Sequence, residues 1–289
     1  MNARTHTPTD APRALAARPR PFRFATFAAM PGVRHGITGR AKALWREGDI
    51  SYATGGDPAA VFANREFWAA SIGVRADALV AVRQVHGNTV DIVTASARGR
   101  GARGLDAATV PAADALLTDA PDTPLLLAFA DCTPLLFHDP QHGVVGLAHA
   151  GWRGTVADIA GETVRALVRH YGSDPAGIIV GIGPAIGPCC YQVDLPVIAA
   201  WEALGVVDHA VALEVEPRAG RRQWRFDLAR ANRRLLERAG VAPAHIEEAA
   251  LCTACHVTAY PSHRAEAGRA GRFAAIIALT GSGEGGAGR

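Results

Sequence analysis

Short apolar runs recur along the chain, separated by segments rich in Gly, Pro and Asp. Runs that are apolar at nearly every position are typical of strands buried on both faces of a sheet. The clearest examples are residues 125–130, which end at Asp131, and residues 144–149, which end before a Gly-Trp-Arg-Gly turn. We predict strands at residues 22–27, 79–84, 89–93, 114–117, 125–130, 134–138, 144–149, 178–182, 245–251 and 273–279.

Helical periodicity alternates with these runs. Ile159, Val164 and Leu167 fall on one stripe of an amphipathic segment. Another segment opens with Asp57 in the N-cap position and Pro58 in the first turn, which is a helix-start signal. We predict helices at residues 58–72, 155–171, 195–204 and 228–239.

The chain shows no clear linker, and the alternation of strands and helices predicts one mixed α/β domain over residues 23–280. Residues 1–22 are rich in Pro, Ala, Arg and Thr without the apolar stretch of a secretory signal, so we expect a disordered tail. We expect a second disordered tail at the Gly-rich residues 281–289. No apolar stretch approaches the roughly 18 residues that a membrane helix needs, so we expect no membrane partner.

The amino-acid composition indicates a packed interior and tells little more about function. Hydrophobic residues make up 49% of the chain and charged residues 20%. The net charge of +3 is small and its arginines are dispersed, which argues against nucleic acid as a partner. Five cysteines, an odd number, favour reduced thiols in a cytoplasm over a disulfide scaffold. The sequence is compatible with a monomer.

Three residues carry the most distinctive chemistry. His86 lies in the segment QVHG (84–87), Cys132 in ADC (130–132) and His149 in HAGWRG (149–154). Two imidazoles and a thiolate suit zinc, and three protein ligands leave the fourth tetrahedral position open, as in catalytic sites. Cys132 and His149 also end predicted strands, where α/β folds commonly place reactive groups. The alternative is a buried thiol with two histidines satisfied in the core.

These segments, in this order, resemble one family. Together with GPAIGPCCY (183–191) they are similar to the laccase-domain, or YfiH/YlmD-like, family, over residues 24–279. That family was long labelled multicopper polyphenol oxidoreductase and is now understood as purine nucleoside phosphorylase. The resemblance implies a β-sandwich-like core with helices on both outer faces. It also implies a metal site formed by His86, Cys132 and His149.

The resemblance further implies a reaction and substrates. Phosphate would attack the ribose C1′ of adenosine, inosine, guanosine or methylthioadenosine, and the purine would leave. Hydrolytic deamination of adenosine is implied as a second activity. The partners are therefore purine nucleosides and phosphate, and the cofactor is zinc, with copper as a second metal that such ligands accept.

Phosphate needs a cation, and the planar fork of arginine suits it. Arg65, Arg153 and Arg264 are the substrate-binding candidates, because each lies in a segment that resembles the family. We favour Arg65 first, then Arg264 and Arg153. Asp131, next to Cys132, is a candidate to orient a metal ligand or to act as a base.

The other four cysteines invite a different interpretation. Cys252 and Cys255, followed by a histidine, match the attachment pattern of c-type haem, but no export signal precedes them. We therefore interpret this pair as structural. Cys189 and Cys190 are adjacent, so we do not expect both to reach one metal, and we predict packed positions near a turn.

Besides a non-enzymatic partner or metal-buffering protein, two alternative functions remain. One is a hydrolase with Cys132 as nucleophile, His149 as base and Asp131 orienting it, acting on peptidoglycan-type amides. The other is a copper-dependent polyphenol oxidase. The chain has 11 histidines but no H-x-H pair, which speaks against the dense histidine set of multicopper sites.

Overall fold

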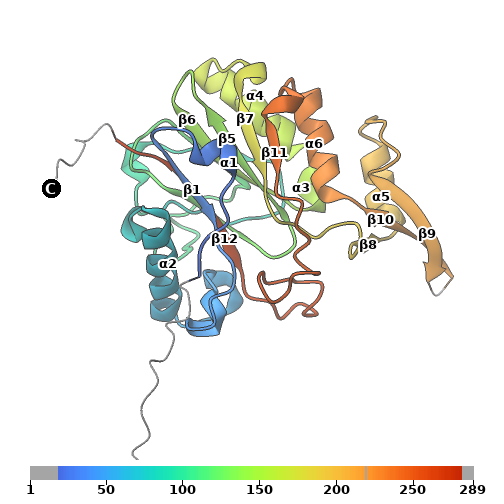
Figure 1. Cartoon of the computed structure of the whole chain (residues 1–289), viewed down its shortest axis with the longest axis horizontal. Coiled ribbons are helices and arrows are strands. Elements are labelled where there is room, and N and C mark those ends of the chain that lie inside the picture. The colour runs from blue at the N-terminus through green and yellow to red at the C-terminus, as the bar shows by residue number, and fades with distance from the viewer. Residues whose placement is uncertain (1–18, 219, 282–289) are drawn as a thin grey trace, which may run out of the picture.

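The computed structural model describes residues 19–218 and 220–281, which form a mixed α/β domain, as the sequence predicts (Figure 1). The predicted tails at residues 1–22 and 281–289 lie mostly outside the described residues. Phe22, the last residue of the first tail, pairs with Ile37 through two backbone hydrogen bonds.

The larger of two stacked sheets is mixed, with strand order β11-β7-β5-β6-β3-β2. The pairs β11·β7 and β2·β3 are parallel and the other neighbours are antiparallel. Its strands are β2 (Val90–Ile92), β3 (Ala115–Thr118), β5 (Thr133–Asp139), β6 (Val144–Ala150), β7 (Ile179–Ile182) and β11 (Ile246–Glu248).

The second sheet has three antiparallel strands in the order β1-β12-β4. These are β1 (Val33–Ile37), β4 (Leu125–Phe129) and β12 (Phe273–Leu279). Leu127 and Phe129 of β4 share one buried cluster with Leu136 of β5 and Leu147 of β6, so the two sheets pack face to face. Strands covered on both faces explain the continuous apolar runs in the sequence.

Helices cover the two outer faces, as the family resemblance implies. On the larger sheet lie α4 (Ile159–Tyr171) and α6 (Leu228–Arg238), and on the smaller sheet lies α2 (Pro58–Ile72). The Asp57 carboxylate accepts from the Ala59 N–H, and Pro58 occupies the first turn, so the predicted start of α2 is confirmed. No helix in the described ranges is long and apolar enough to cross a membrane.

A small third sheet projects from one end of the domain, at the right of Figure 1. Its order is β8-β10-β9, and α5 contacts β10. The elements are β8 (Gln192–Val193), α5 (Leu195–Glu202), β9 (Ala212–Arg218) and β10 (Arg221–Phe226). The hairpin of β9 and β10 was not predicted. It has many charged residues, so the alternation of apolar and polar positions that is typical of a half-exposed strand cannot be recognised.

Three predicted elements are wrong in detail. Residues 22–27 contain the short helix α1 (Ala25–Ala28) instead of an edge strand, and the Glu247 carboxylate accepts the N–H groups of Ala25 and Thr26 at its start. Residues 79–84 form isolated bridges and no continuous strand. The predicted helix 155–171 is split into α3 (Trp152–Val156) and α4, because Asp158 has a left-handed backbone with φ of 59° and caps α4.

Candidate metal centre

His86, Cys132 and His149 converge at one end of the sandwich. Their ring nitrogens and sulfur all lie within 4.8 Å of one another, close enough to hold a metal ion. His86 precedes β2, Cys132 directly precedes β5, and His149 lies in β6. In β6, Val145 and Leu147 face the second sheet, so strand alternation places His149 on that same side.

Asp114 organises two of these residues and was not identified from the sequence. Its fully buried carboxylate accepts N–H groups from Val85 at 3.2 Å, His86 at 2.9 Å and Gly87 at 2.7 Å. These bonds hold His86 in a left-handed conformation with φ of 63°, and its side chain is exposed. The sequence does contain a clue, because Asp114 is a carboxylate at the start of an apolar strand. A carboxylate is seldom buried in such a place unless it has a partner.

The same carboxylate sets the orientation of His149. Asp114 Oδ1 lies 2.9 Å from His149 Nδ1, and the His149 N–H donates to the Asp114 carbonyl at 2.7 Å. With Nδ1 engaged, Nε2 is left for the cluster, which is the arrangement that carboxylate–histidine–metal sites use. Asp114, and not Asp131, therefore orients this imidazole.

Cys132 and His149 form a coupled pair. Burial tends to raise the pKa of the Cys132 thiol, but the neighbouring His149 and His86 imidazoles outweigh it and lower that pKa to about 6. Burial tends to lower the pKa of His149, but Cys132 and the Asp114 carboxylate raise it to about 9. A thiolate beside an imidazolium is the form this geometry favours, and a thiolate is also the form that binds metals.

Gly151 leaves room for the cluster. A Cβ at this position would lie 2.8 Å from Cys132 Sγ and 3.3 Å from His86 Cδ2. Real side chains do not come as close as 2.8 Å, so any larger residue would displace Cys132 Sγ and crowd the His86 ring.

Asp131 has a different set of partners from the one the sequence suggested. Its Oδ1 accepts the Thr253 hydroxyl at 2.6 Å, and its Oδ2 accepts the Arg264 N–H at 2.7 Å. Its carboxylate thus holds a C-terminal loop beside Cys132 and makes no hydrogen bond to the metal-centre histidines within the described ranges.

The cluster opens into a cavity of about 440 Å³, which also contains Arg65 and Arg272. This volume falls within the roughly 300–1,000 Å³ of small-molecule sites. Arg65 is only 2% exposed, and its guanidinium donates to the carbonyls of Ile50, Gly101 and Ala102. It also stacks on Tyr52 at 4.4 Å, so its charge is held rigidly in the cavity wall.

The other two predicted arginines lie outside this cavity. Arg153 is exposed and stacks on Trp152 at 4.4 Å. Arg264 is exposed, donates to the Gln192 carbonyl and stacks on Tyr191 at 5.2 Å. Arg272, which the sequence did not single out, shares the cavity with Arg65 instead.

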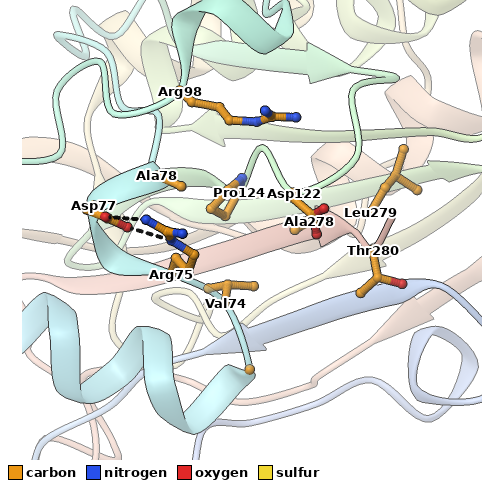
Figure 2. Close-up of a pocket in the computed structure, with 11 residues that line it drawn as sticks. Val74, Arg75, Asp77, Ala78, Arg98, Asp122, Pro124, Ala278, Leu279 and Thr280 are labelled. Carbon is orange, nitrogen blue, oxygen red and sulfur yellow. Dashed lines mark hydrogen bonds and ion pairs between the residues drawn. The ribbon is translucent and has the colours of Figure 1, made fainter. Parts of the chain in front are cut away.

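A larger cavity, of about 650 Å³, lies elsewhere, next to residues 74–78 and the end of β12 (Figure 2). Arg75 is paired there with Asp77 at 2.6 Å, and Arg98 donates to Thr123 and to the Pro121 carbonyl. No cysteine or histidine is among its described lining residues. This cavity is therefore not the candidate reactive site, although it is larger than the cavity at the cluster.

Comparison with known proteins identifies the family. The family model described as multi-copper polyphenol oxidoreductase laccase matches residues 32–280. The chain belongs to this family. Within the laccase family, it is 39% identical over 244 residues to purine nucleoside phosphorylase YlmD of Geobacillus stearothermophilus, covering 84% of this chain and 87% of the relative. It is 38% identical over 219 residues to purine nucleoside phosphorylase YlmD of Bacillus subtilis, covering 76% and 77%.

A solved structure has the same fold. The hypothetical protein YfiH of Bacillus licheniformis superposes with a TM-score of 0.80 at 34% identity, over 86% of this chain and 93% of that one.

Proposed function

We propose that this laccase-family chain is a purine nucleoside phosphorylase with zinc held by His86, Cys132 and His149. The observation that carries the proposal is the cavity of about 440 Å³ that joins these three groups to the buried cation of Arg65. The names of the relatives at 38–39% identity support the choice of reaction.

The donor set supports zinc as the metal. Two imidazoles and one thiolate with a carboxylate behind one imidazole are a common zinc arrangement with an open coordination position. When bound, zinc would supply a Lewis acid for a substrate or water oxygen. Copper binds such ligands more tightly than zinc, so a copper-loaded form with weak oxidase activity is compatible with the same site.

Phosphorolysis would divide the remaining work among the residues of the cavity. A phosphate oxygen bonds to C1′ of the ribose while the bond from C1′ to the purine nitrogen breaks, and the purine leaves with the electron pair. Arg65 would bind the phosphate, because a fixed guanidinium makes strong, charge-assisted hydrogen bonds to a doubly charged anion. Arg272 adds a second positive charge to the same cavity. Asp114 keeps His86 and His149 in place throughout.

Adenosine, inosine, guanosine and methylthioadenosine are the proposed substrates. We also propose hydrolytic deamination of adenosine at this centre, in which water adds at C6 and ammonia leaves. The five free thiols suit a reducing cytoplasm.

Product analysis tests the reaction. Zinc-loaded protein incubated with inosine and phosphate is expected to release ribose 1-phosphate and hypoxanthine, with no cleavage when phosphate is omitted. Equal cleavage without phosphate would make the protein a nucleoside hydrolase. Incubation with adenosine in the absence of phosphate tests deamination, through the appearance of inosine and ammonia.

A Cys132-dependent hydrolase is the second candidate, and one observation favours it. Cys132, His149 and Asp114 are linked as nucleophile, base and orienting carboxylate in the general Cys–His pattern. Stoichiometric labelling of Cys132 in active, metal-free protein, with turnover of a peptidoglycan-type amide, would support the hydrolase. About one zinc per chain at this centre, lost together with activity in His86→Ala, would support the phosphorylase.

A further inference from the structure

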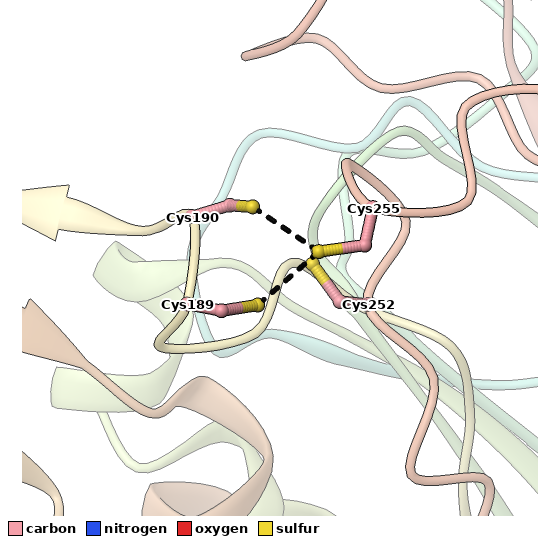
Figure 3. Close-up of side chains that lie close together, drawn as sticks. All are labelled: Cys189, Cys190, Cys252 and Cys255. Atoms are coloured by element: carbon pink, nitrogen blue, oxygen red, sulfur yellow. Dashed lines mark hydrogen bonds between the residues drawn. The ribbon is translucent and has the colours of Figure 1, made fainter.

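Four cysteines that the proposed reaction does not use come together on the surface. Cys189 and Cys190 belong to one turn and Cys252 and Cys255 to another, and the four side chains point toward one another (Figure 3). Their sulfurs all lie within 4.8 Å of one another. Cys255 Sγ is 3.5 Å from Cys189 Sγ and 3.4 Å from Cys190 Sγ.

We propose that these four cysteines form a second, structural metal site that binds one zinc ion per chain. Zinc–sulfur bonds of about 2.3 Å in a tetrahedron place the sulfurs roughly 3.8 Å apart, which is the spacing scale of this cluster. Four thiolates leave no open position, so this site would be closed, unlike the centre at His86, Cys132 and His149.

Adjacent cysteines can reach one ion here because the backbone turns sharply before them. The N–H groups of Cys190 and Tyr191 both donate to the Gly187 carbonyl at 3.0 Å. This turn directs both sulfurs toward the second loop, which corrects the prediction that Cys189 and Cys190 do not both reach one metal and are packed near a turn.

The backbone also prepares the cluster for thiolates. The Gly187 N–H donates to Cys252 Sγ at 3.2 Å, and hydrogen bonds to the charged form favour the thiolate. A Cβ on Gly187 would lie 3.3 Å from Cys252 Cβ and 3.4 Å from Cys189 Sγ, so glycine permits this approach. A parallel bridge between Ala185 and Cys252 sets the two loops side by side.

The site has an entry path and a structural consequence. Cys189 and Cys255 are exposed, so an ion can arrive from solvent. Between Cys252 and Cys255 lies Thr253, whose hydroxyl donates to the Asp131 carboxylate beside Cys132. The second metal would therefore fix the loop that supports the first centre. Binding would exchange the thiol protons for zinc, with no oxidant required.

Metal analysis of paired variants separates the two sites. Parent protein, purified without added metal and dialysed against a weak chelator, is expected to hold two zinc ions per chain. Cys189→Ser/Cys255→Ser is expected to lose one of them, and Cys132→Ser is expected to lose the other. If the first centre binds no metal, parent and Cys132→Ser would each hold one ion, so failure of the proposed function remains distinguishable.

Cobalt substitution identifies the ligands. Cobalt-loaded Cys132→Ser is expected to show the strong thiolate-to-metal charge-transfer absorption of a four-sulfur site, whereas Cys189→Ser/Cys255→Ser is expected to show no more than the weaker absorption of the single Cys132 thiolate at the first centre. His256→Ala is the matched control, because His256 lies in the same turn but its Nδ1 contacts the Cys252 carbonyl. It is expected to retain both ions. Unchanged metal content in the double-serine variant, or cysteines 189, 190, 252 and 255 recovered as disulfides by mass spectrometry, would overturn the proposal.

Discussion

The Asp114 carboxylate lies 2.9 Å from His149 Nδ1 while it also accepts the backbone N–H of His86 at 2.9 Å. One buried carboxylate thus positions two of three candidate metal ligands, one through its ring and the other through its backbone.

Asp114→Asn should weaken zinc binding at the first centre by about 10–100-fold, the usual range for a residue that orients a ligand. The asparagine side chain has one acceptor oxygen and one NH2 donor group. Its NH2 group would face some of the three N–H groups and the imidazole that now donate to the carboxylate. The zinc dissociation constant, measured by chelator competition, checks this. Asp119→Asn, an exposed carboxylate just beyond the same strand, should behave as the parent does. Equal affinities in both variants would contradict the role of Asp114.

Replacing His86, Cys132 or His149 by alanine should abolish activity and cost more zinc affinity than Asp114→Asn, because a ligand itself is lost. Zinc content, turnover and circular dichroism should be measured together. His86→Ala is the cleanest variant, because this side chain is exposed and its removal leaves no buried space. Full activity in any one of the three variants would show that the replaced residue is not a ligand of the catalytic metal.

Gly151→Ala should lower zinc affinity at the first centre at least about tenfold with little effect on folding. The added methyl would enter the space of Cys132 Sγ, at 2.8 Å, and the cluster would have to shift. Gly177→Ala is the control, because a Cβ there would meet nothing within 4 Å. Thermal melts and chelator competition on both variants test it, and equal zinc affinity would show that the cluster has more freedom than the packing indicates.

Arg65→Lys should raise KM for phosphate by roughly tenfold or more while kcat changes little, which is the signature of lost substrate binding. Lysine keeps the charge but loses the planar fork. The change should also lower the free energy of unfolding by about 1–3 kcal/mol, since buried carbonyls lose donors. Arg153→Lys, outside the cavity, is the control. An unchanged KM for phosphate would indicate that Arg272, and not Arg65, binds phosphate.

In metal-free protein, the pair of Cys132 and His149 should stabilise the fold most between about pH 6 and pH 9. The pKa of Cys132 is lowered to about 6, so its contribution is lost as pH falls through that value. The pKa of His149 is raised to about 9, so its contribution is lost as pH rises through that value. Melting temperatures of the parent and of Cys132→Ser across this range test it. Identical pH profiles would contradict the pairing.

Local sequence patterns predicted much of the fold, but they failed where an element depends on distant parts of the chain. The apolar run 273–279 matches β12 at both ends, and the predicted helix at residues 228–239 is found as α6, which Asp227 caps by accepting the Arg230 N–H. Residues 79–84 were misassigned because their neighbours provide only isolated bridges, which depend on chain far away in sequence.

The candidate site divides in the same way. Segment resemblance found His86, Cys132 and His149, which the structure brings together. Asp114 and Arg272 were missed because their significance comes only from contacts across the fold. The two pairs of surface cysteines lie more than 60 residues apart in the sequence, and the bridge between Ala185 and Cys252 brings their loops side by side in the fold.

The pairing of β5 with β6 has a consequence for how this protein can vary. Pro134 lies opposite His149, so the position of Cys132 relative to His149 depends on the register of a single hairpin. A shift by one residue would turn His149 to the helix-covered face of the sheet. Insertions or deletions between β5 and β6 are therefore tolerable only if the turn absorbs them completely. The length of this hairpin constrains the chemistry as strictly as the identity of the ligands does.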